Sequence, residues 1–313
     1  MEAMDTTERP DADDDRTPQL SGGTIRVLHH PGKSDVAERF AAGLEGSAWT
    51  VESRSTDDAD EVGRLARRAV DDGVDVVGSV GGDGSANLVL AALDGGGVPL
   101  LIIPAGTVNL TATVNGVDSV EAAVEALVAG HTVPFDLGAD GDERFAINAS
   151  SGVDAAIIGE GADHSDAVLG RFEFARAALH RLREDRPRQV RVVVDGEVAY
   201  AGRAMSVIVM NVGQRASASL DVAPDARTDD GLLDLAVARI STLPSSIRVV
   251  VKLALGRPTS SGELLRRQGR SFEIDWDTSL TTQRDGDAVD ERSTLRYDVR
   301  PGAIRLVVPP PPA

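Results

Sequence analysis

The sequence of 313 residues contains no cysteine, which excludes a disulfide framework, a thiolate nucleophile and a cysteine-ligated metal or iron–sulfur site. Aromatic residues make up only 3 %, which argues against platforms on which nucleic-acid bases stack. Basic residues are also few compared with acidic ones. The chain has 32 lysines and arginines and 50 aspartates and glutamates, which gives a formal net charge of −18. A protein this acidic is not held on DNA or RNA by phosphate neutralisation, so we expect no nucleic-acid partner.

Long hydrophobic runs are also lacking. The apolar stretch at 98–103 is far shorter than the roughly 20 residues that span a bilayer. The acidic start of the chain has no apolar core of a secretory signal, so we expect a soluble, cytoplasmic protein. With this net charge, contact with a membrane would be transient and peripheral. It would use apolar loops or a local basic face that includes Arg171, Arg176, Arg181 and Arg183.

The pattern of apolar residues divides the chain into a tail and two domains. Residues 1–23 mix acidic residues, threonine and proline with almost no large apolar side chains, which predicts a disordered tail. From 24 to 132, short apolar strands alternate with helical patterns, which predicts a three-layer α/β domain with a parallel sheet. From 133 to 298, short strand-like runs separated by turn signals predict a β-sandwich. Two helical patterns, at 163–183 and 243–255, interrupt these strands.

A glycine-rich loop is the clearest candidate site. It lies between a buried strand predicted at 74–80 and a helix predicted at 85–93, and it reads Gly81, Gly82, Asp83, Gly84, Ser85, Ala86 and Asn87. Glycines let backbone N–H groups approach an anion closely, and a helix N-terminus favours phosphate. A carboxylate beside a phosphate needs a cation between them, so Asp83 suggests Mg²⁺. The alternative is a tight turn in which Asp83 only caps the helix.

A second loop follows the next buried strand, predicted at 99–103. Its Gly106 and Thr107 offer backbone and hydroxyl donors to the same phosphates, because neighbouring parallel strands end at the same edge of a sheet. Two common phosphate motifs do not fit the chain. A P-loop ending at Gly32 would need a glycine at Val27, and a dinucleotide fingerprint would need one at Asn87.

These two loops, GGDGSAN and IPAGTVN, resemble those of the diacylglycerol kinase catalytic family, which includes bacterial lipid kinases and sphingosine kinases. Later segments are similar to further family motifs in the same order: NASSGVDA at 148–155, DDGLLD at 229–234, and RPGA at 300–303. Asp285-Gly286-Asp287 stands where the family has Asp-Gly-Glu. The resemblance covers nearly the whole chain after the tail. It extends more distantly to NAD kinases and phosphofructokinases, which share the GGDG loop.

The resemblance implies an α/β nucleotide-binding domain and a β-sandwich for the lipid substrate, with the active site between them. The closing strands near 299–309 would return toward the first domain. ATP and Mg²⁺ would be the cofactors. The residues expected at the nucleotide are Pro31, Thr56, Gly81, Gly82, Asp83, Gly84, Ser85, Asn87, Gly106 and Thr107.

The same resemblance assigns roles in the second domain. A structural metal would be held by the carboxylate of Asp230 and by the carbonyls of Arg227 and Leu232. The catalytic residues would be Asp83, at the Mg²⁺ and phosphate group, and Asp287 as general base. Replacing the family's glutamate with Asp287 shortens the reach by roughly 1.5 Å. A misplacement of about 1 Å can cost on the order of a hundredfold in rate.

The leading function is therefore an ATP-dependent lipid kinase, which transfers the γ-phosphoryl group to a hydroxyl of diacylglycerol or a similar lipid. One alternative is an NAD-kinase-like kinase of a soluble substrate. Another is a non-catalytic lipid- or nucleotide-binding protein, which the departures from the family pattern at His30, Leu110 and Asp287 motivate. A homodimer is a further possibility for the partners of this chain.

Overall fold

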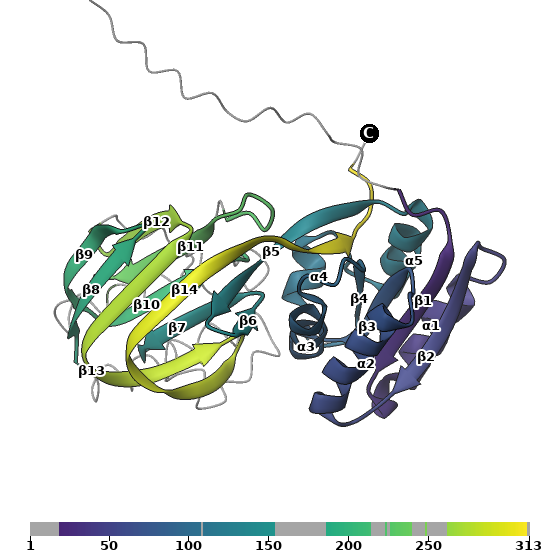
Figure 1. Ribbon diagram of the computed structural model, residues 1–313, viewed down its shortest axis with the longest axis horizontal. Coiled ribbons are helices and arrows are strands. Elements are labelled where there is room, and N and C mark those ends of the chain that lie inside the picture. Colours follow the sequence, from purple (N-terminus) through teal and green to yellow (C-terminus); the bar gives the residue numbers. More distant parts are fainter. Residues whose placement is uncertain are drawn as a thin grey trace, which may run out of the picture.

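The computed structural model describes residues 19–107, 109–153, 186–213, 226–239 and 262–311, together with Ala223 and Arg248. Most of the predicted tail, the helical pattern at 163–183, the pattern at 243–255 apart from Arg248, and the four arginines of the proposed basic face lie outside the described residues. Figure 1 shows two lobes, an α/β domain and a β-rich domain. They are joined by β5 (Thr132–Asp140) and β14 (Asp287–Val307), which run through both.

The first domain is a parallel sheet covered by helices. Its strands pair in the order β2-β1-β3-β4, with bounds β1 (Gly23–His29), β2 (Trp49–Ser55), β3 (Val76–Gly81) and β4 (Leu100–Pro104). The pairs α1 with α5 and α2 with α3 pack together, with bounds α1 (Ser34–Gly43), α2 (Ala59–Asp71), α3 (Asp83–Leu93) and α5 (Val120–Ala129). This arrangement confirms the predicted three-layer α/β domain.

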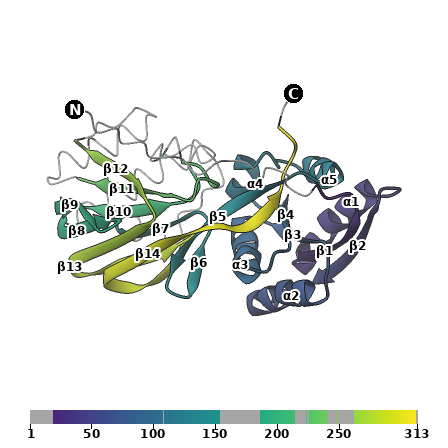
Figure 2. The same ribbon diagram turned by 45° about the horizontal axis from the view of Figure 1, so that its top comes forward.

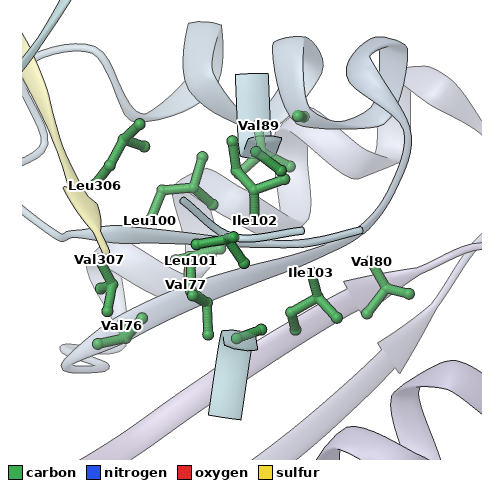
Figure 3. Packing of buried hydrophobic residues seen from close by; sticks show 14 of the residues in the cluster. Val76, Val77, Val80, Val89, Leu100, Leu101, Ile102, Ile103, Leu306 and Val307 are labelled. Atoms are coloured by element: carbon green, nitrogen blue, oxygen red, sulfur yellow. The ribbon is translucent and has the colours of Figure 1, made fainter. Parts of the chain in front are cut away.

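The central strands are buried on both faces, which explains their continuous apolar sequence. All residues of β3 and β4 are buried. Figure 3 shows their side chains packed with Val89 of α3 and with Leu306 and Val307 of β14. Asp58 begins α2 by accepting hydrogen bonds from the backbone N–H groups of Asp60 and Glu61, the orphan donors of a helix start.

The second domain is an antiparallel, β-sandwich-like unit, as predicted. Its strands are β6 (Glu143–Phe145), β7 (Asn148–Gly152), β8 (Arg188–Val194), β9 (Glu197–Ala204), β10 (Ser206–Met210), β11 (Leu233–Ala238), β12 (Leu264–Gly269) and β13 (Ser271–Arg284). The described strands pair in the order β12-β11-β10-β7-β13-β14, and β8 also pairs with β13. In the core, Phe145 meets Tyr297 edge to face at a centroid distance of 5.6 Å.

β14 connects the two domains. It pairs with β13 in the second domain, then with β5, and its Leu306 pairs in parallel with Leu100 of β4 (Figure 2). The closing strands expected near 299–309 are therefore the end of one long strand, which is irregular between Arg300 and Ile304. The predicted domain boundary at 132/133 falls at the start of β5, whose Phe135 packs in the first core.

Some elements have no counterpart in the sequence-based prediction. They are β9, β12, the five-residue helix α4 (Leu110–Val114) and the short 3-10 helix η1 (Pro31–Lys33). The helix predicted at 85–93 begins earlier, at Asp83. None of the helices in the described part of the chain is both long enough and apolar enough to cross a membrane.

Candidate active site

The two glycine loops touch one another at the carboxyl ends of β3 and β4. The N–H of Ala105 donates to the carbonyl of Gly81 at 2.9 Å. A Cβ built on Gly106 would overlap the backbone of Gly82, so the close approach of the loops requires glycine there. Asn109 braces the second loop, since its Oδ1 accepts from the N–H of Gly106 at 2.8 Å and its Nδ2 donates to the carbonyl of the same residue at 2.9 Å. The loops thus form one unit.

Asp83 joins the first loop to the second. Its Oδ2 accepts from the N–H of Leu110 and its Oδ1 from the N–H of Thr111, both at 2.9 Å. These donors belong to the first turn of α4, where backbone N–H groups have no partner within the helix. Asp83 therefore caps α4 rather than its own helix. Each carboxylate oxygen keeps a further lone pair, so the role of cation ligand stays a prediction.

Unpaired polar atoms lie beside this carboxylate. Within the described residues, Oδ1 and Nδ2 of Asn87 and Oγ1 of Thr111 are buried without a hydrogen-bond partner. Asn87 lies one helical turn after Asp83 on the same side of α3, and Thr111 is bonded to Asp83 through its N–H. Buried polar atoms are normally paired, so this cluster suits a bound ligand. Its carboxylate, amide and hydroxyl oxygens are ligands that Mg²⁺ accepts.

A cavity of about 150 Å³ lies next to the first loop, at the ends of β1 and β3. Thr56 and Ser85, two of the predicted nucleotide residues, line it together with His30. The hydroxyl of Thr56 donates to Glu61 at 2.6 Å and accepts from the N–H of Asp58 at 3.1 Å, so it also organises the start of α2. A cavity below about 300 Å³ takes only part of a nucleotide.

The remaining nucleotide residues surround these features. Pro31, in η1, is exposed directly after His30. Gly84, in the first turn of α3, and Thr107, in the second loop, are exposed. The structure therefore brings the predicted residues to one edge of the sheet, and their contacts with a nucleotide stay a prediction.

The hairpin between β13 and β14 forms the part of the site from the second domain. Asp285 and Gly286 make its two-residue tip, with φ of 50° and 94°. The carboxylate of Asp285 accepts from the N–H groups of Ala146 and Ile147 at 2.7 Å and of Asn148 at 3.0 Å. Burial raises the pKa of Asp285 to about 6, and the charge of Asp83 adds to this effect, while the three N–H donors oppose it. The tip is thus bonded to the residues directly after β6, and β6 packs against α3, the helix that begins at Asp83.

Asp287 differs from Asp285 in its surroundings. It begins β14 and is exposed, and its side chain forms no hydrogen bond or ion pair with any described residue. Of the two carboxylates in this motif, Asp285 anchors the hairpin, whereas Asp287 is available for chemistry. The resemblance predicts Asp287 as the base, whereas the anchoring role of Asp285 comes only from the structure.

The loop that carries the predicted metal ligands is fixed by a residue that the sequence analysis missed. Asp136, buried in β5, accepts from the N–H groups of Gly231 and Gly302, each at 2.7 Å. Burial raises the pKa of Asp136, and the neighbouring charges of Asp230 and Asp229 add to this. An aspartate inside the apolar run at 133–137 was the available signal.

The predicted ligands Arg227, Asp230 and Leu232 all lie on this loop. Oδ1 of Asp230 accepts from the N–H of Leu232 at 3.0 Å, and the side chain of Arg227 pairs with Asp229 at 3.1 Å. In the part of the chain that is described, no three acidic or histidine side chains gather as a metal site. The predicted set depends on two backbone carbonyls, so it stays a prediction.

An ion pair connects the two domains at the C-terminal end of α3, the end opposite Asp83. Asp94, which follows α3, accepts from Nε of Arg144 in β6 at 2.7 Å, and Arg300 of β14 lies 3.6 Å away. The side chains of Asp94 and Arg144 are only 10 % and 18 % exposed. Fold and site together define a two-domain protein with an α/β domain, a β-sandwich-like domain and a pair of glycine loops that form a candidate anion site.

Comparison with known families assigns both domains. Residues 29–139 match the diacylglycerol kinase catalytic domain. Residues 148–308 match the YegS C-terminal NAD kinase beta sandwich-like domain. The chain therefore belongs to the diacylglycerol kinase family of lipid kinases, with the C-terminal domain of its YegS-like members.

Individual relatives agree with this assignment. A protein of Cronobacter sakazakii named "Probable lipid kinase YegS-like" is 29% identical over 93% of this chain and 97% of its own length. A protein of the same name from Serratia proteamaculans is 30% identical, over 91% of this chain and 94% of its own length. A crystal structure of a diacylglycerol kinase from Bacillus anthracis is 17% identical with a TM-score of 0.68, over 92% of this chain and 97% of that one, and supports the fold.

Proposed function

We propose that this protein transfers the γ-phosphoryl group of Mg-ATP to a hydroxyl of diacylglycerol or a similar lipid. The observation that carries the proposal is a pair of elements, one in each domain, which are linked by the packing of α3 against β6. One is the pair of glycine loops held by Asp83, and the other is the hairpin that presents the unpaired carboxylate of Asp287. Phosphoryl transfer requires these two things, a cradle for phosphates and a base near the attacking hydroxyl.

The glycine loops would bind the phosphates through backbone N–H groups, with Thr56 and Ser85 at the adjoining cavity. Mg²⁺, when bound, would neutralise phosphate charge, and the oxygens of Asp83 and Asn87 would face it. Asp287 would accept the proton of the lipid hydroxyl as its oxygen forms a bond to the γ-phosphorus. The bond from that phosphorus to the bridging oxygen breaks, and ADP leaves.

The lipid acceptor is supported by the names of the relatives rather than by a cavity. A cavity of about 670 Å³ lies at the domain junction, lined in part by Val114, Val133, Val212 and Val308. The described residues that line it include none from the GGDG loop, so it does not by itself locate the acceptor. Cytoplasmic location, transient membrane contact, the structural metal at Asp230 and a homodimer belong to the same proposal.

The test is transfer of labelled phosphate from Mg-ATP to purified lipids and to soluble acceptors, including NAD. We expect labelled diacylglycerol-like lipid with the native chain. Asp287→Asn should lower kcat by about 10²–10⁴-fold, the usual contribution of a general base. Asp298→Asn, an exposed aspartate on the same strand, is the matched control and should keep native kcat.

Two results would contradict the proposal. Label found only in soluble acceptors would identify the NAD-kinase-like alternative. Native kcat in Asp287→Asn would remove Asp287 from the reaction, whatever the acceptor.

A further inference from the structure

Gln283 is a completely buried glutamine, the second-last residue of β13 and two residues before Asp285 of the hairpin tip. Its Oε1 accepts from the N–H of Gly286 at 2.9 Å. Its Nε2 donates to Oδ1 of Asn148 and, at 2.8 Å, to Oγ of Ser150. The side chain of Gln283 thus joins the backbone of the turn at Gly286 to two residues of β7. Burying a polar side chain costs free energy unless its bonds are made, and here all of them are made by the turn and the neighbouring strand.

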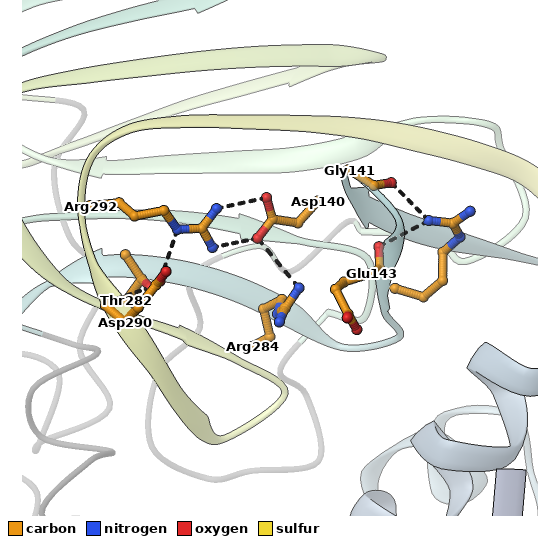
Figure 4. Close-up of polar contacts among 8 residues, drawn as sticks. Asp140, Gly141, Glu143, Thr282, Arg284, Asp290 and Arg292 are labelled. Atoms are coloured by element: carbon orange, nitrogen blue, oxygen red, sulfur yellow. Dashed lines mark hydrogen bonds and ion pairs between the residues drawn. The ribbon is translucent and has the colours of Figure 1, made fainter. Parts of the chain in front are cut away.

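The opposite face of the hairpin is held by a second network. Successive residues of a strand point to opposite faces, so Arg284 lies on the face away from Gln283. Figure 4 shows the side chain of Arg292 reaching Asp140 of β5 with two bonds, at 2.6 and 3.0 Å, and Asp290 at 2.9 Å. Arg284 approaches the same carboxylate of Asp140 at 3.5 Å. The strands on both sides of the tip are therefore anchored to β5.

The tip itself depends on Asp285 and Gln283. Asp285 fixes its position through three N–H groups of the chain leading into β7, whereas Gln283 bonds to the N–H of Gly286, the residue directly before Asp287. In the register of the hairpin, Gln283 faces Ala288 and Arg284 faces Asp287. A change at Gln283 therefore acts on the backbone that carries Asp287, without touching the glycine loops of the first domain.

We propose that Gln283 is a positioning residue for Asp287: it holds the turn at Gly286 so that the carboxylate of Asp287 is presented to the acceptor hydroxyl. The proposal rests on the function proposed above. The short side chain of aspartate has one rotatable bond fewer than glutamate, so Asp287 has less freedom to correct a displaced backbone. A shift of about 1 Å at a reacting group costs on the order of a hundredfold in rate.

The first test is Gln283→Met, which keeps the length of the side chain and removes every bond. We expect kcat to fall roughly 10–100-fold with the KM for ATP nearly unchanged, because the nucleotide loops lie in the other domain. Gln268→Met makes the same change on β12 of the same domain, where the glutamine is exposed, and should leave kcat as in the native chain. An unchanged kcat in Gln283→Met would overturn the proposal.

A double-variant comparison separates positioning from general stability. If Gln283 acts through Asp287, then Gln283→Met should lower the residual rate of Asp287→Asn by less than about threefold. An equal fold-loss in both backgrounds would overturn the proposal, because it would mean that Gln283 supports the fold and not Asp287.

A conservative variant guards against a Met variant that does not fold. In Gln283→Glu, the carboxylate still accepts from the N–H of Gly286. In the native chain Ser150 and Asn148 accept from the amide of Gln283. In Gln283→Glu, the hydroxyl of Ser150 and the NH₂ group of a rotated Asn148 can instead donate to the new carboxylate. We expect kcat within about fivefold of the native value. A loss as large as that of Asp287→Asn in a folded Gln283→Glu would contradict the geometry.

Hydrogen exchange tests the structural step independently of activity. In Gln283→Met the amide of Gly286 loses its acceptor, so the peptide 284–290 should exchange faster than in the native chain, while 81–93 in the first domain should not change. Unaltered exchange at 284–290 would overturn the proposal. If the native chain phosphorylates no lipid, the proposed function fails, and the exchange result still decides whether Gln283 holds the turn.

Discussion

Asp83 provides the sharpest test of the site, because its two oxygens have defined partners. Each accepts one backbone N–H at 2.9 Å, from Leu110 and Thr111. Asp83→Asn keeps the shape of the side chain but replaces one acceptor oxygen with an NH₂ group. That group faces an N–H that it cannot accept from, so one donor of α4 is left unpaired and the other keeps only a neutral bond.

The magnitude follows from these two bonds. Hydrogen bonds to charged groups contribute about 1.5–3 kcal/mol, and neutral ones about 1 kcal/mol. Losing one charged bond and weakening the other, in a half-buried position, should lower the free energy of unfolding by about 2–3 kcal/mol. At roughly 2–4 °C per kcal/mol for a chain of this size class, Tm should fall by roughly 4–12 °C.

The assay is urea unfolding, together with hydrogen exchange of the amides of Leu110 and Thr111, which should exchange faster in Asp83→Asn. Asp35→Asn is the matched control, since Asp35 is an exposed aspartate in the first turn of α1. It should change stability by less than about 0.5 kcal/mol. If Asp83→Asn is as stable as Asp35→Asn, the carboxylate does not hold α4, and the reasoning about the joined loops is wrong.

Two further predictions concern buried carboxylates. Because burial raises the pKa of Asp285 from 3.8 to about 6, the folded chain binds an extra proton between these values. The free energy of unfolding of the native chain, compared with that of Asp285→Asn, should therefore increase as the pH falls from 7 to 4, by on the order of 3 kcal/mol. Urea titrations at several pH values measure this difference in free energy. A difference that does not change with pH would refute the prediction. Arg144→Met leaves Asp94 without its 2.7 Å partner and should lower the free energy of unfolding by about 1–3 kcal/mol. Arg39, whose ion pair with Glu121 is exposed, provides the control, and Arg39→Met should lower the free energy of unfolding by less than about 0.5 kcal/mol. Equal losses in Arg144→Met and Arg39→Met would show that the ion pair between the domains stabilises the protein no more than an exposed one.

The first domain could be predicted from the sequence in some detail. Continuous apolar runs are typical of strands buried on both faces, and those expected at 74–80 and 99–103 are β3 and β4. The helix α4 could not be predicted, because five residues are too few for a periodic pattern and its first N–H groups are satisfied by Asp83, 27 and 28 residues away. The continuity of β14 could not be predicted, because the irregular segment after Arg300 has the residues of a turn.

The sequence by itself determined where chemistry can occur. Glycines at strand ends, a carboxylate among them and the ordered series of motifs are local patterns, and they sufficed for the family and the two-domain organisation. Only the tertiary structure decided which backbone groups each of these polar side chains binds and which loop it holds. Asp83 caps a distant helix, Asp285 bonds to backbone 137–139 residues away, and Gln283 bonds to strand β7, 133 and 135 residues away. Asp83 meets its partners inside the first domain, and Asp285 and Gln283 meet theirs inside the second, where β13 pairs with β7. Strand pairing and helix packing within each domain create these contacts, and no pattern along the chain records them.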